Sequence, residues 1–236
     1  MRRVMRQLIR SAKRSNEWKA SRRTAAPFSR RLVIMVKEPH AGRVKTRLAR
    51  EIGVVAATGF YRHAASAVVG RLGRATEWET WLAVAPDAAR SSRFWSPHIP
   101  RRAQGGGDLG SRMQRIFGWA GRGPILIVGT DIPAIEPRHI RDAFRALGGS
   151  DAVLGPTPDG GYWLVGSRRS PRVFAPFKNV RWSSEHTLAD TVGNLEGKVA
   201  YAARLGDVDD AAEWRCVRGW SGRRVLPMML RQTNET

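Results

Sequence analysis

The sequence lacks several features that would decide its class at once. It has a single cysteine, Cys216, among 236 residues, which excludes an internal disulfide framework and favours a reducing compartment. No apolar run approaches the roughly 20 residues that a membrane-spanning helix needs. Acidic residues are scarce, since 20 Asp and Glu stand against 41 Lys and Arg, for a formal net charge of +21. We therefore expect a soluble, cytoplasmic protein that attracts anions, either phosphorylated small molecules or nucleic acid.

The beginning of the chain holds much of the positive charge. Its first 31 residues contain eleven Lys or Arg and one Glu, without the apolar core of a secretory signal. Apolar residues between Val4 and Ile9 share one helical face, which would give weak contact with a membrane surface. A disordered basic tail is the favoured alternative. We expect this tail at residues 1–30, one domain at 31–220 and a C-terminal tail at 221–236.

Short apolar runs alternate with helix-like stretches in the rest of the chain. The runs are rich in Val, Ile, Leu and Trp, as buried strands are, and lie at residues 32–36, 81–85, 125–128, 152–154 and 163–165. The helix-like stretches lie at 53–72, 109–120, 137–147 and 184–195, the last with Ser183 or Ser184 as N-cap. This alternation predicts an α/β fold with a mainly parallel sheet and helices on both faces. In such sheets ligands bind beyond the carboxyl ends of the strands.

The turn after the first strand gathers positive charge. In "RLVIMVKEPHAGRVKTRLAR", Lys37 ends the strand, and Gly42 is followed by Lys45 and Arg47. We expect a helix to begin near Val44, so that backbone N–H groups and the cations together could hold a phosphate. The stretch does not match a Walker loop, because its first glycine and the Gly before the lysine are missing. A solvated basic loop is the alternative.

A second loop, "GGGDLG" at residues 105–110, fits the pattern G-x-G-x-x-G. No strong apolar strand precedes it and it is not the first turn of the sheet, so we do not assign a dinucleotide fold. Gly107 and Asp108, with Arg112 in the first turn of the next helix, could still cradle a nucleotide. A flexible turn is the alternative.

Four acidic residues are candidates for metal binding or catalysis. "PILIVGTDIP" places Asp131 at the carboxyl end of a strand, where a hard oxygen ligand beside a phosphate loop favours Mg²⁺ or Mn²⁺. "GDVDD" brings Asp207 and Asp209 to a later strand end, where a second ligand could lie. Each of these residues could instead cap a turn or a helix. In "GPTPDGGYWLVG", Asp159 lies in an expected β-hairpin turn, and we assign it as a general base or acceptor ligand.

Taken in order, the stretches "KEPHAGRVKTRLA", "QGGGDLGSRM", "GTDIPAIEP", "VLGPTPDGGYWLVG", "RWSS" and "DVDD" resemble a bacterial family of glycosyltransferase-A-like proteins. This family is labelled radical-SAM/selenodomain-associated transferase and is similar to phospholactate guanylyltransferases. The resemblance spans roughly residues 31–215. It implies a nucleotide-diphospho-sugar transferase fold, which has a Rossmann-like sheet, a nucleotide over its carboxyl edge and a divalent metal on the phosphates.

The resemblance also assigns roles by position. Lys37, Lys45 and Arg47 match the basic residues of the phosphate loop, and Asp131 matches the acidic residue at the metal. Asp207 and Asp209 match a late Asp-x-Asp element that completes the metal site in related nucleotidyltransferases.

Three positions depart from the family pattern. Ala41 replaces a proline, Ser111 replaces an acidic residue, and Asp210 replaces a threonine. These departures affect recognition of the acceptor and the base, and leave the phosphate and metal positions intact.

These observations favour a metal-dependent transferase that takes a nucleotide sugar or a nucleoside triphosphate, with an unknown acceptor. Lys45 would face the departing phosphates and act with Asp159 in catalysis, while Arg43 would lie on the outer side of the loop. Glycosyl transfer is the first choice, and nucleotidyl transfer with release of pyrophosphate is the alternative. A basic nucleic-acid-binding protein is a rival of another class, but no motif of a specific recognition module is present.

Overall fold

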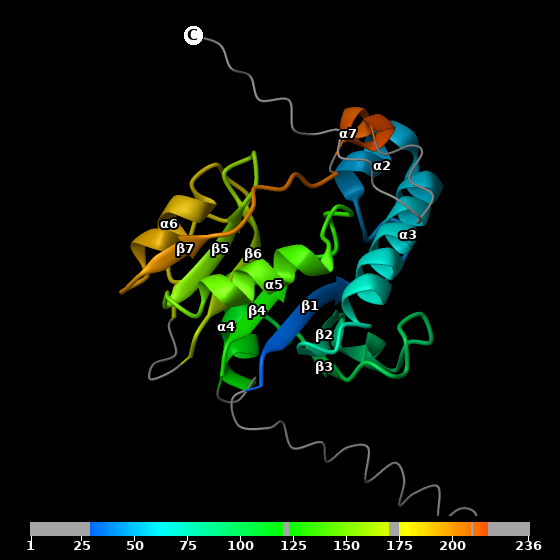
Figure 1. Ribbon diagram of the computed structural model, residues 1–236. Coiled ribbons are helices and arrows are strands. Elements are labelled where there is room, and N and C mark those ends of the chain that lie inside the picture. The colour runs from blue at the N-terminus through cyan, green and yellow to red at the C-terminus, as the bar shows by residue number, and fades with distance from the viewer. Residues whose placement is uncertain (1–28, 120–122, 170–174, 209, 217–236) are drawn as a thin grey trace, which may run out of the picture.

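The computed structural model describes residues 29–119, 123–169, 175–208 and 210–216 (Figure 1). The expected tails lie almost wholly outside these residues, and so does Asp209. The elements are β1 (Arg31–Lys37), α2 (Thr46–Ile52), α3 (Val54–Leu72), β2 (Glu79–Ala85), η1 (Asp87–Ser91), β3 (Arg101–Ala103), α4 (Leu109–Trp119), β4 (Ile125–Val128), α5 (Pro137–Ala146), β5 (Ala152–Pro156), β6 (Tyr162–Ser167), α6 (Thr187–Gly193), β7 (Val199–Tyr201) and α7 (Ala211–Cys216).

The strands form one mixed sheet of seven, in the order β3-β2-β1-β4-β6-β5-β7. β1 pairs in parallel with both β2 and β4, and β2 pairs in parallel with β3. β6 runs antiparallel to its neighbours β4 and β5, whereas β7 is parallel to β5. All five apolar runs in the sequence fall inside these strands. The prediction of a mainly parallel α/β sheet is confirmed.

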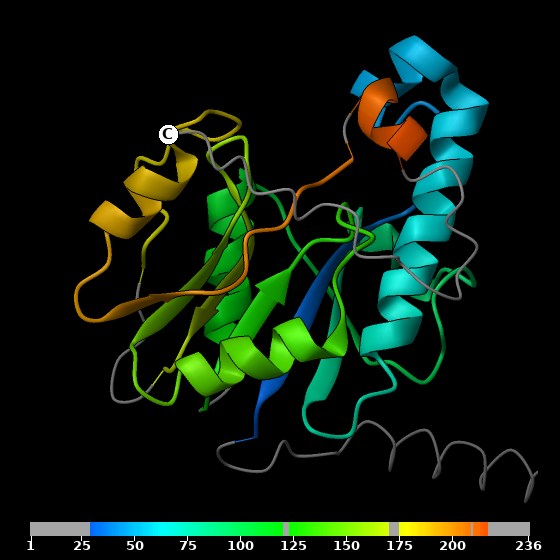
Figure 2. The same ribbon diagram turned by 45° about the horizontal axis from the view of Figure 1, so that its top comes forward.

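Both faces of the sheet are buried, as the continuous apolar strands require. Successive residues of β1 alternate between two cores. Leu32 and Ile34 pack in a cluster with side chains of α3 and α5, and Val33 packs in a second cluster with side chains of α4. Figure 2 shows α5 in front of the sheet and α4 behind it. The sheet is therefore the middle layer of three, and its strand ends are free to form a site.

The helix predicted at residues 53–72 is α3, which runs from Val54 to Leu72, and the helix expected to begin near Val44 is α2. α2 begins at Thr46, two residues later than expected, and ends at Ile52. Gly53 then separates it from α3 with φ 87 and ψ 153, a conformation that a residue with a Cβ rarely adopts. Both helices were therefore predicted, with starts within two residues of those observed. The break lets α2 turn away from α3 beside the loop that follows β1.

One helix boundary was predicted wrongly, at the start of α6. α6 begins at Thr187 rather than residue 184, and its N-cap is His186, so neither predicted serine caps it. Ser183 instead adopts a left-handed φ of 58, which is incompatible with the first turn of a helix. A short strand, β3, does precede the glycine loop, although "HIPRRAQ" looked too polar for one. It lies at the edge of the sheet, where a polar strand is tolerated.

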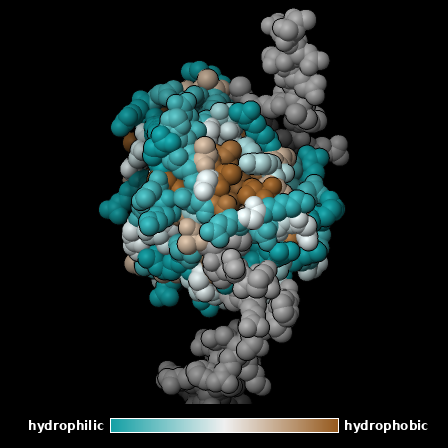
Figure 3. Space-filling model, turned by 90° about the vertical axis from the view of Figure 1, so that its left-hand side faces the viewer, coloured by the Kyte–Doolittle hydropathy of each residue, from teal (hydrophilic) through white to brown (hydrophobic). Residues whose placement is uncertain are grey.

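The predicted hairpin at residues 155–166 is confirmed, with β5 and β6 pairing antiparallel on either side of the turn. β7 forms the opposite edge of the sheet from β3. Figure 3 shows the side of the molecule that lies on the left of Figure 1, where apolar atoms gather within a hydrophilic surround. Within the described part of the chain, no helix has the length and apolarity to cross a membrane.

Candidate functional site

A cavity of about 650 Å³ opens at the carboxyl ends of β1 and β4. Helix α2 flanks it on one side and the β5–β6 hairpin on the other (Figures 1 and 2). Predicted site residues from five separate stretches of the sequence meet there, namely Lys37, Lys45, Arg47, Arg112, Asp131, Asp159 and Asp207. This is the place that the topology of a parallel sheet favours for a ligand.

Two residues that line this cavity, Lys45 and Asp131, form an ion pair. The Lys45 ammonium lies 3.3 Å from Asp131 Oδ1, and the Lys45 side chain is 6% exposed while that of Asp131 is 54% exposed. Lys45 is the N-cap of α2 and adopts a left-handed φ of 46, which turns the chain just after the loop. Asp131 lies three residues after the end of β4. The pair therefore joins the first loop to the central strand end.

Tyr61 fixes the strand end that carries Lys37. Its hydroxyl accepts a hydrogen bond from Lys37 N at 2.9 Å and donates to Lys37 O at 3.0 Å. Thr130 Oγ1 lies 3.4 Å from the same hydroxyl. Burial raises the pKa of Tyr61 to about 12, so the phenol stays protonated and keeps both roles at neutral pH. Tyr61 thus holds the backbone of Lys37, while Lys37 itself is exposed and lines the cavity.

Asp131 and Asp207 are the cavity carboxylates that could hold a divalent ion of the magnesium type. Val208 N donates to Asp131 O at 3.3 Å, so the loop that carries Asp207 lies against the end of β4. Among the described residues, no group of three or more His, Cys, Asp or Glu could hold a metal ion. Mg²⁺ is commonly held by one or two carboxylates together with substrate phosphates and water. Asp131 and Asp207 supply that number.

Asp159 is held by its own turn. Its Oδ1 accepts hydrogen bonds from Thr157 Oγ1 and from Gly161 N, the latter at 3.0 Å. Thr157 and Gly161 also line the cavity. No described residue donates to Oδ2, which leaves that oxygen for a ligand. The geometry thus combines the turn-forming role that Asp-Gly sequences favour with a second oxygen available for chemistry.

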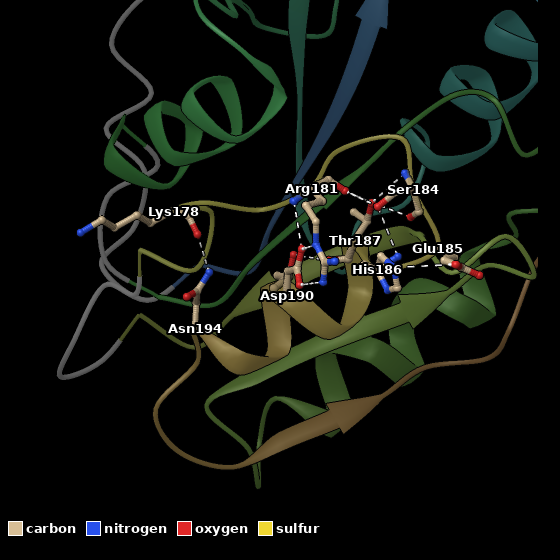
Figure 4. A network of polar contacts seen from close by, with 9 residues as sticks. Lys178, Arg181, Ser184, Glu185, His186, Thr187, Asp190 and Asn194 are labelled. Atoms are coloured by element: carbon tan, nitrogen blue, oxygen red, sulfur yellow. Dashed lines mark hydrogen bonds and ion pairs between the residues drawn. The ribbon is translucent and has the colours of Figure 1, made fainter.

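A dense polar network forms the wall next to the hairpin (Figure 4). The Arg181 guanidinium makes two hydrogen bonds to the Asp190 carboxylate, at 2.9 and 2.8 Å, and Arg181 N makes a third at 3.0 Å. Hydroxyl groups of Ser184 and Thr187 both donate to Arg181 O. Leu188 N donates to the carbonyl of the hairpin residue Gly160 at 2.9 Å. These bonds fix the segment that presents cavity-lining hydroxyl groups.

The glycine loop contributes less to the cavity than predicted. Gly42, Gly107 and Asp108 do not line it, and their part in nucleotide binding stays a prediction. Asp108 Oδ1 accepts a hydrogen bond from Ser111 N at 2.8 Å, which caps the start of α4. The Ser111 hydroxyl and N–H lower the pKa of Asp108, and the Trp182 side chain adds a smaller contribution.

Several cavity residues were missed or misplaced by sequence reasoning. Arg43 lines the cavity, so its predicted position on the outer side of the loop was wrong. Tyr61, Gln104 and Trp182 also line it, and no role was assigned to any of them. "RWSS" and the glutamine of "QGGGDLGSRM" belong to the family-like stretches, which was the available signal. Tyr61 lies mid-helix, where nothing in the sequence distinguishes it from an ordinary core aromatic.

Comparison with known proteins points to transferases. The profile of a family described as uncharacterized proteins conserved in bacteria (DUF2064) matches residues 68–184. No curated protein matches the chain. A crystal structure of a candidate nucleotide-diphospho-sugar transferase from Desulfovibrio desulfuricans G20 is 27% identical, with a TM-score of 0.74, and the match covers 84% of this chain and 91% of the other.

More distant structures share the fold alone. A 4-diphosphocytidyl-2C-methyl-D-erythritol synthase from Anaerococcus prevotii DSM 20548 is 10% identical with a TM-score of 0.55, over 82% of this chain and 98% of the other. A nucleotidyl transferase from Methanothermobacter thermautotrophicus is 15% identical with a TM-score of 0.52, over 81% and 96%. The glycosyltransferase-A-like fold is therefore shown, while the radical-SAM/selenodomain label stays a prediction.

Proposed function

We propose that the protein is a transferase that takes a nucleotide-activated donor, with glycosyl transfer from a nucleotide sugar as its reaction. One observation carries this proposal. The cations Lys37, Arg43, Lys45, Arg47 and Arg112 line a single cavity at the strand ends, together with Asp131 and Asp207. Such a set suits a diphosphate and its divalent counter-ion better than a neutral substrate. The similarity to the Desulfovibrio protein supports the same class.

The chain's residues have separable tasks in this reaction. The bond between the anomeric carbon and the diphosphate breaks, and negative charge develops on the departing nucleoside diphosphate. Lys45 and Arg47 would stabilise that charge, because they line the cavity from the start of α2. The acceptor hydroxyl forms the new bond to the anomeric carbon. Its proton would pass to Asp159 Oδ2, while Oδ1 stays engaged in the turn.

Asp131 and Asp207 would hold Mg²⁺ or Mn²⁺ on the diphosphate. When bound, such an ion neutralises phosphate charge and favours departure of the leaving group. The Lys45–Asp131 ion pair keeps a positive and a negative group side by side at this point. Asp131 is the more exposed partner and is thus accessible to an ion in the cavity.

Nucleotidyl transfer is a second candidate, favoured by the number of cations. Five Lys or Arg side chains line the cavity against three Asp side chains, counting Asp159. A triphosphate carries more charge than a diphosphate sugar, and its pyrophosphate leaving group would use more of these cations. In this reaction the acceptor would attack the α-phosphate, and pyrophosphate would depart.

Product analysis decides between the two reactions. A thermal-shift screen of nucleotide sugars and nucleoside triphosphates with Mg²⁺ or Mn²⁺ would first identify a donor, since a ligand at 100 times its Kd stabilises by about 2.7 kcal/mol. Turnover would then be followed with the donor found. Release of nucleoside diphosphate supports glycosyl transfer, and release of pyrophosphate supports nucleotidyl transfer. Tight DNA binding at about 0.2 M salt without residues 1–30, and no nucleotide binding, would instead favour the nucleic-acid rival.

A further inference from the structure

Gln104 is a buried polar residue in the wall of the cavity, only 5% exposed. It follows the edge strand β3 and reaches across the neighbouring strand. Its Nε2 donates to Ala83 O at 2.8 Å and to Val36 O at 3.1 Å. Both partners are carbonyl oxygens, which only accept, so the orientation of the amide is fixed by its surroundings. Both amide hydrogens are thereby committed to the sheet.

The backbone of Gln104 is held equally firmly. Its N–H donates to Val84 O at 3.0 Å, and its carbonyl accepts a hydrogen bond from the Arg115 guanidinium of α4. Arg115 also donates to Gly106 O at 3.1 Å, which anchors the start of the glycine loop. The side chain can therefore not turn over to offer its amide nitrogen to a ligand without losing two hydrogen bonds. Its carbonyl Oε1 is the single polar atom left to present.

Oε1 is open to the cavity. Among the described residues no group donates a hydrogen bond to Oε1. Oε1 is also not one of the solvent-inaccessible polar atoms that lack a partner in this part of the chain, so it is accessible from the cavity. A nearly buried hydrogen-bond acceptor in a cavity wall destabilises the protein unless a ligand or water donates a hydrogen bond to it. Gln104 thus offers a ligand one pre-oriented acceptor.

The surroundings of Gln104 select a flat, largely apolar group. Met35 and Ile127 from the sheet and Leu109 and Met113 from α4 line the same cavity. Leu109 is 45% exposed, which is unusual for a large apolar side chain unless something covers it. Apolar walls with one or two fixed polar atoms are typical of a site for a heteroaromatic ring. A polyol would need more hydrogen-bond partners than these walls provide.

We propose that Gln104 determines base specificity, with its fixed carbonyl accepting a hydrogen bond from the exocyclic amine of the nucleobase. This inference rests on the proposed function, because it assumes that a nucleotide enters the cavity. A base with a keto oxygen at that position would place two acceptors face to face. A site that leaves a buried acceptor unpaired discriminates strongly against the wrong ligand.

Three pairs of nucleoside diphosphates that differ in the exocyclic amine test the proposal. CDP is compared with UDP, GDP with IDP, and ADP with purine riboside diphosphate, each in Mg²⁺ by calorimetry. For the base that binds best, the member with the amine should bind at least about tenfold more tightly, a difference of about 1.4 kcal/mol. Gln104→Met keeps the size of the side chain but removes the acceptor, and should reduce this ratio to below about threefold. Gln114→Met, outside the cavity, should leave the ratio unchanged.

The outcomes distinguish failure of the Gln104 proposal from failure of the proposed function. Equal binding within every pair, or an undiminished ratio in Gln104→Met, overturns the role of Gln104. Absence of binding by all six nucleotides overturns the proposed function as well. A general structural role for Gln104 would weaken both members of a pair together and leave the ratio unchanged. The comparison of ligands uses the wild-type protein, so it decides the matter even where Gln104→Met fails to fold.

Discussion

The two walls of the cavity are polar in different ways. On the α2 side, Tyr61 holds the backbone of Lys37 at the end of β1, while Lys37 itself is exposed and lines the cavity. On the α6 side, Arg181 and Asp190 bind each other through three hydrogen bonds (Figure 4). The first wall therefore presents the charge of Lys37 to the cavity, whereas in the second wall Arg181 and Asp190 satisfy each other.

This difference separates binding from positioning. A cation that lines the cavity contributes to a phosphate site through its charge, so removing it should change ligand affinity. A pair that is already satisfied internally acts through the segment that it orders, and its loss should first change stability. The four predictions below follow this division, beginning with the largest expected effect.

Asp131→Asn should abolish most of the activity. The amide still accepts a hydrogen bond from Lys45, so the fold should survive, but it is a poorer partner for a hard cation. We expect turnover to fall by about a hundredfold or more, and nucleotide affinity to lose its response to Mg²⁺ or Mn²⁺. The control is Asp142→Asn, an exposed acid paired with Arg145 on α5. Nucleotide affinity that still rises with metal in Asp131→Asn would remove Asp131 from the metal site.

Lys45→Met should weaken nucleotide binding by about 1.5–3 kcal/mol, which corresponds to a lost hydrogen bond to a charged group. Arg50→Met is the matched control, because Arg50 is exposed in the last turn of the same helix and does not line the cavity. Titration calorimetry with the donor identified above measures both. If the two variants lost the same affinity, the loop would act only through its general positive field.

The residues on the α2 side of the cavity could be predicted from the sequence because they follow a local pattern. A buried strand ending in Lys37, then a Gly turn with Lys45 and Arg47, is visible in one stretch of residues, and parallel topology places it at the strand ends. Asp131 was found by the same argument. These positions need no long-range contact to be recognised.

Other cavity residues could not be predicted because they matter through contacts with distant partners. Trp182 lies over Gly110, and Gln104 reaches across β2 to β1, and neither contact leaves a periodic signal. Where tertiary packing decides the conformation, propensity alone is a weak guide.

Gly110→Ala tests how tightly α4 packs against Trp182, which adjoins Arg181 in the α6-side wall. A Cβ at Gly110 would lie 2.7 Å from Trp182 Cζ2 and 2.9 Å from Phe177 Cβ, so one of them must move. We expect a loss of about 1–3 kcal/mol in the free energy of unfolding. Gly118→Ala in the same helix meets nothing within 4 Å and should be neutral or stabilising by up to about 1 kcal/mol. Denaturant unfolding of both variants measures the difference.

Equal stability of these two alanine variants would mean that Trp182 can move away from α4 freely. In that event the cavity wall would be adjustable rather than fixed, and the distinction between the two walls would fail. A Gly110→Ala protein that folds but binds nucleotide less well would instead show that Trp182 shapes the ligand site.

Asp190→Asn should have the smallest effect, and a distinctive dependence on pH. The Arg181 side chain, and then Arg181 N, donate to Asp190 and hold its pKa well below the usual range. A carboxyl whose pKa is lower in the folded state stabilises the fold above its unfolded pKa of about 3.9 and loses that effect as pH falls. Wild type should therefore melt at a higher temperature than Asp190→Asn at pH 7, and the gap should narrow below about pH 4. Melting temperatures of both proteins at several pH values test this. Because Arg181 and Asp190 shape a wall without carrying ligand charge, nucleotide affinity at pH 7 should change far less than in Lys45→Met. An affinity loss as large as that of Lys45→Met would show that the ordered wall is itself part of the phosphate site.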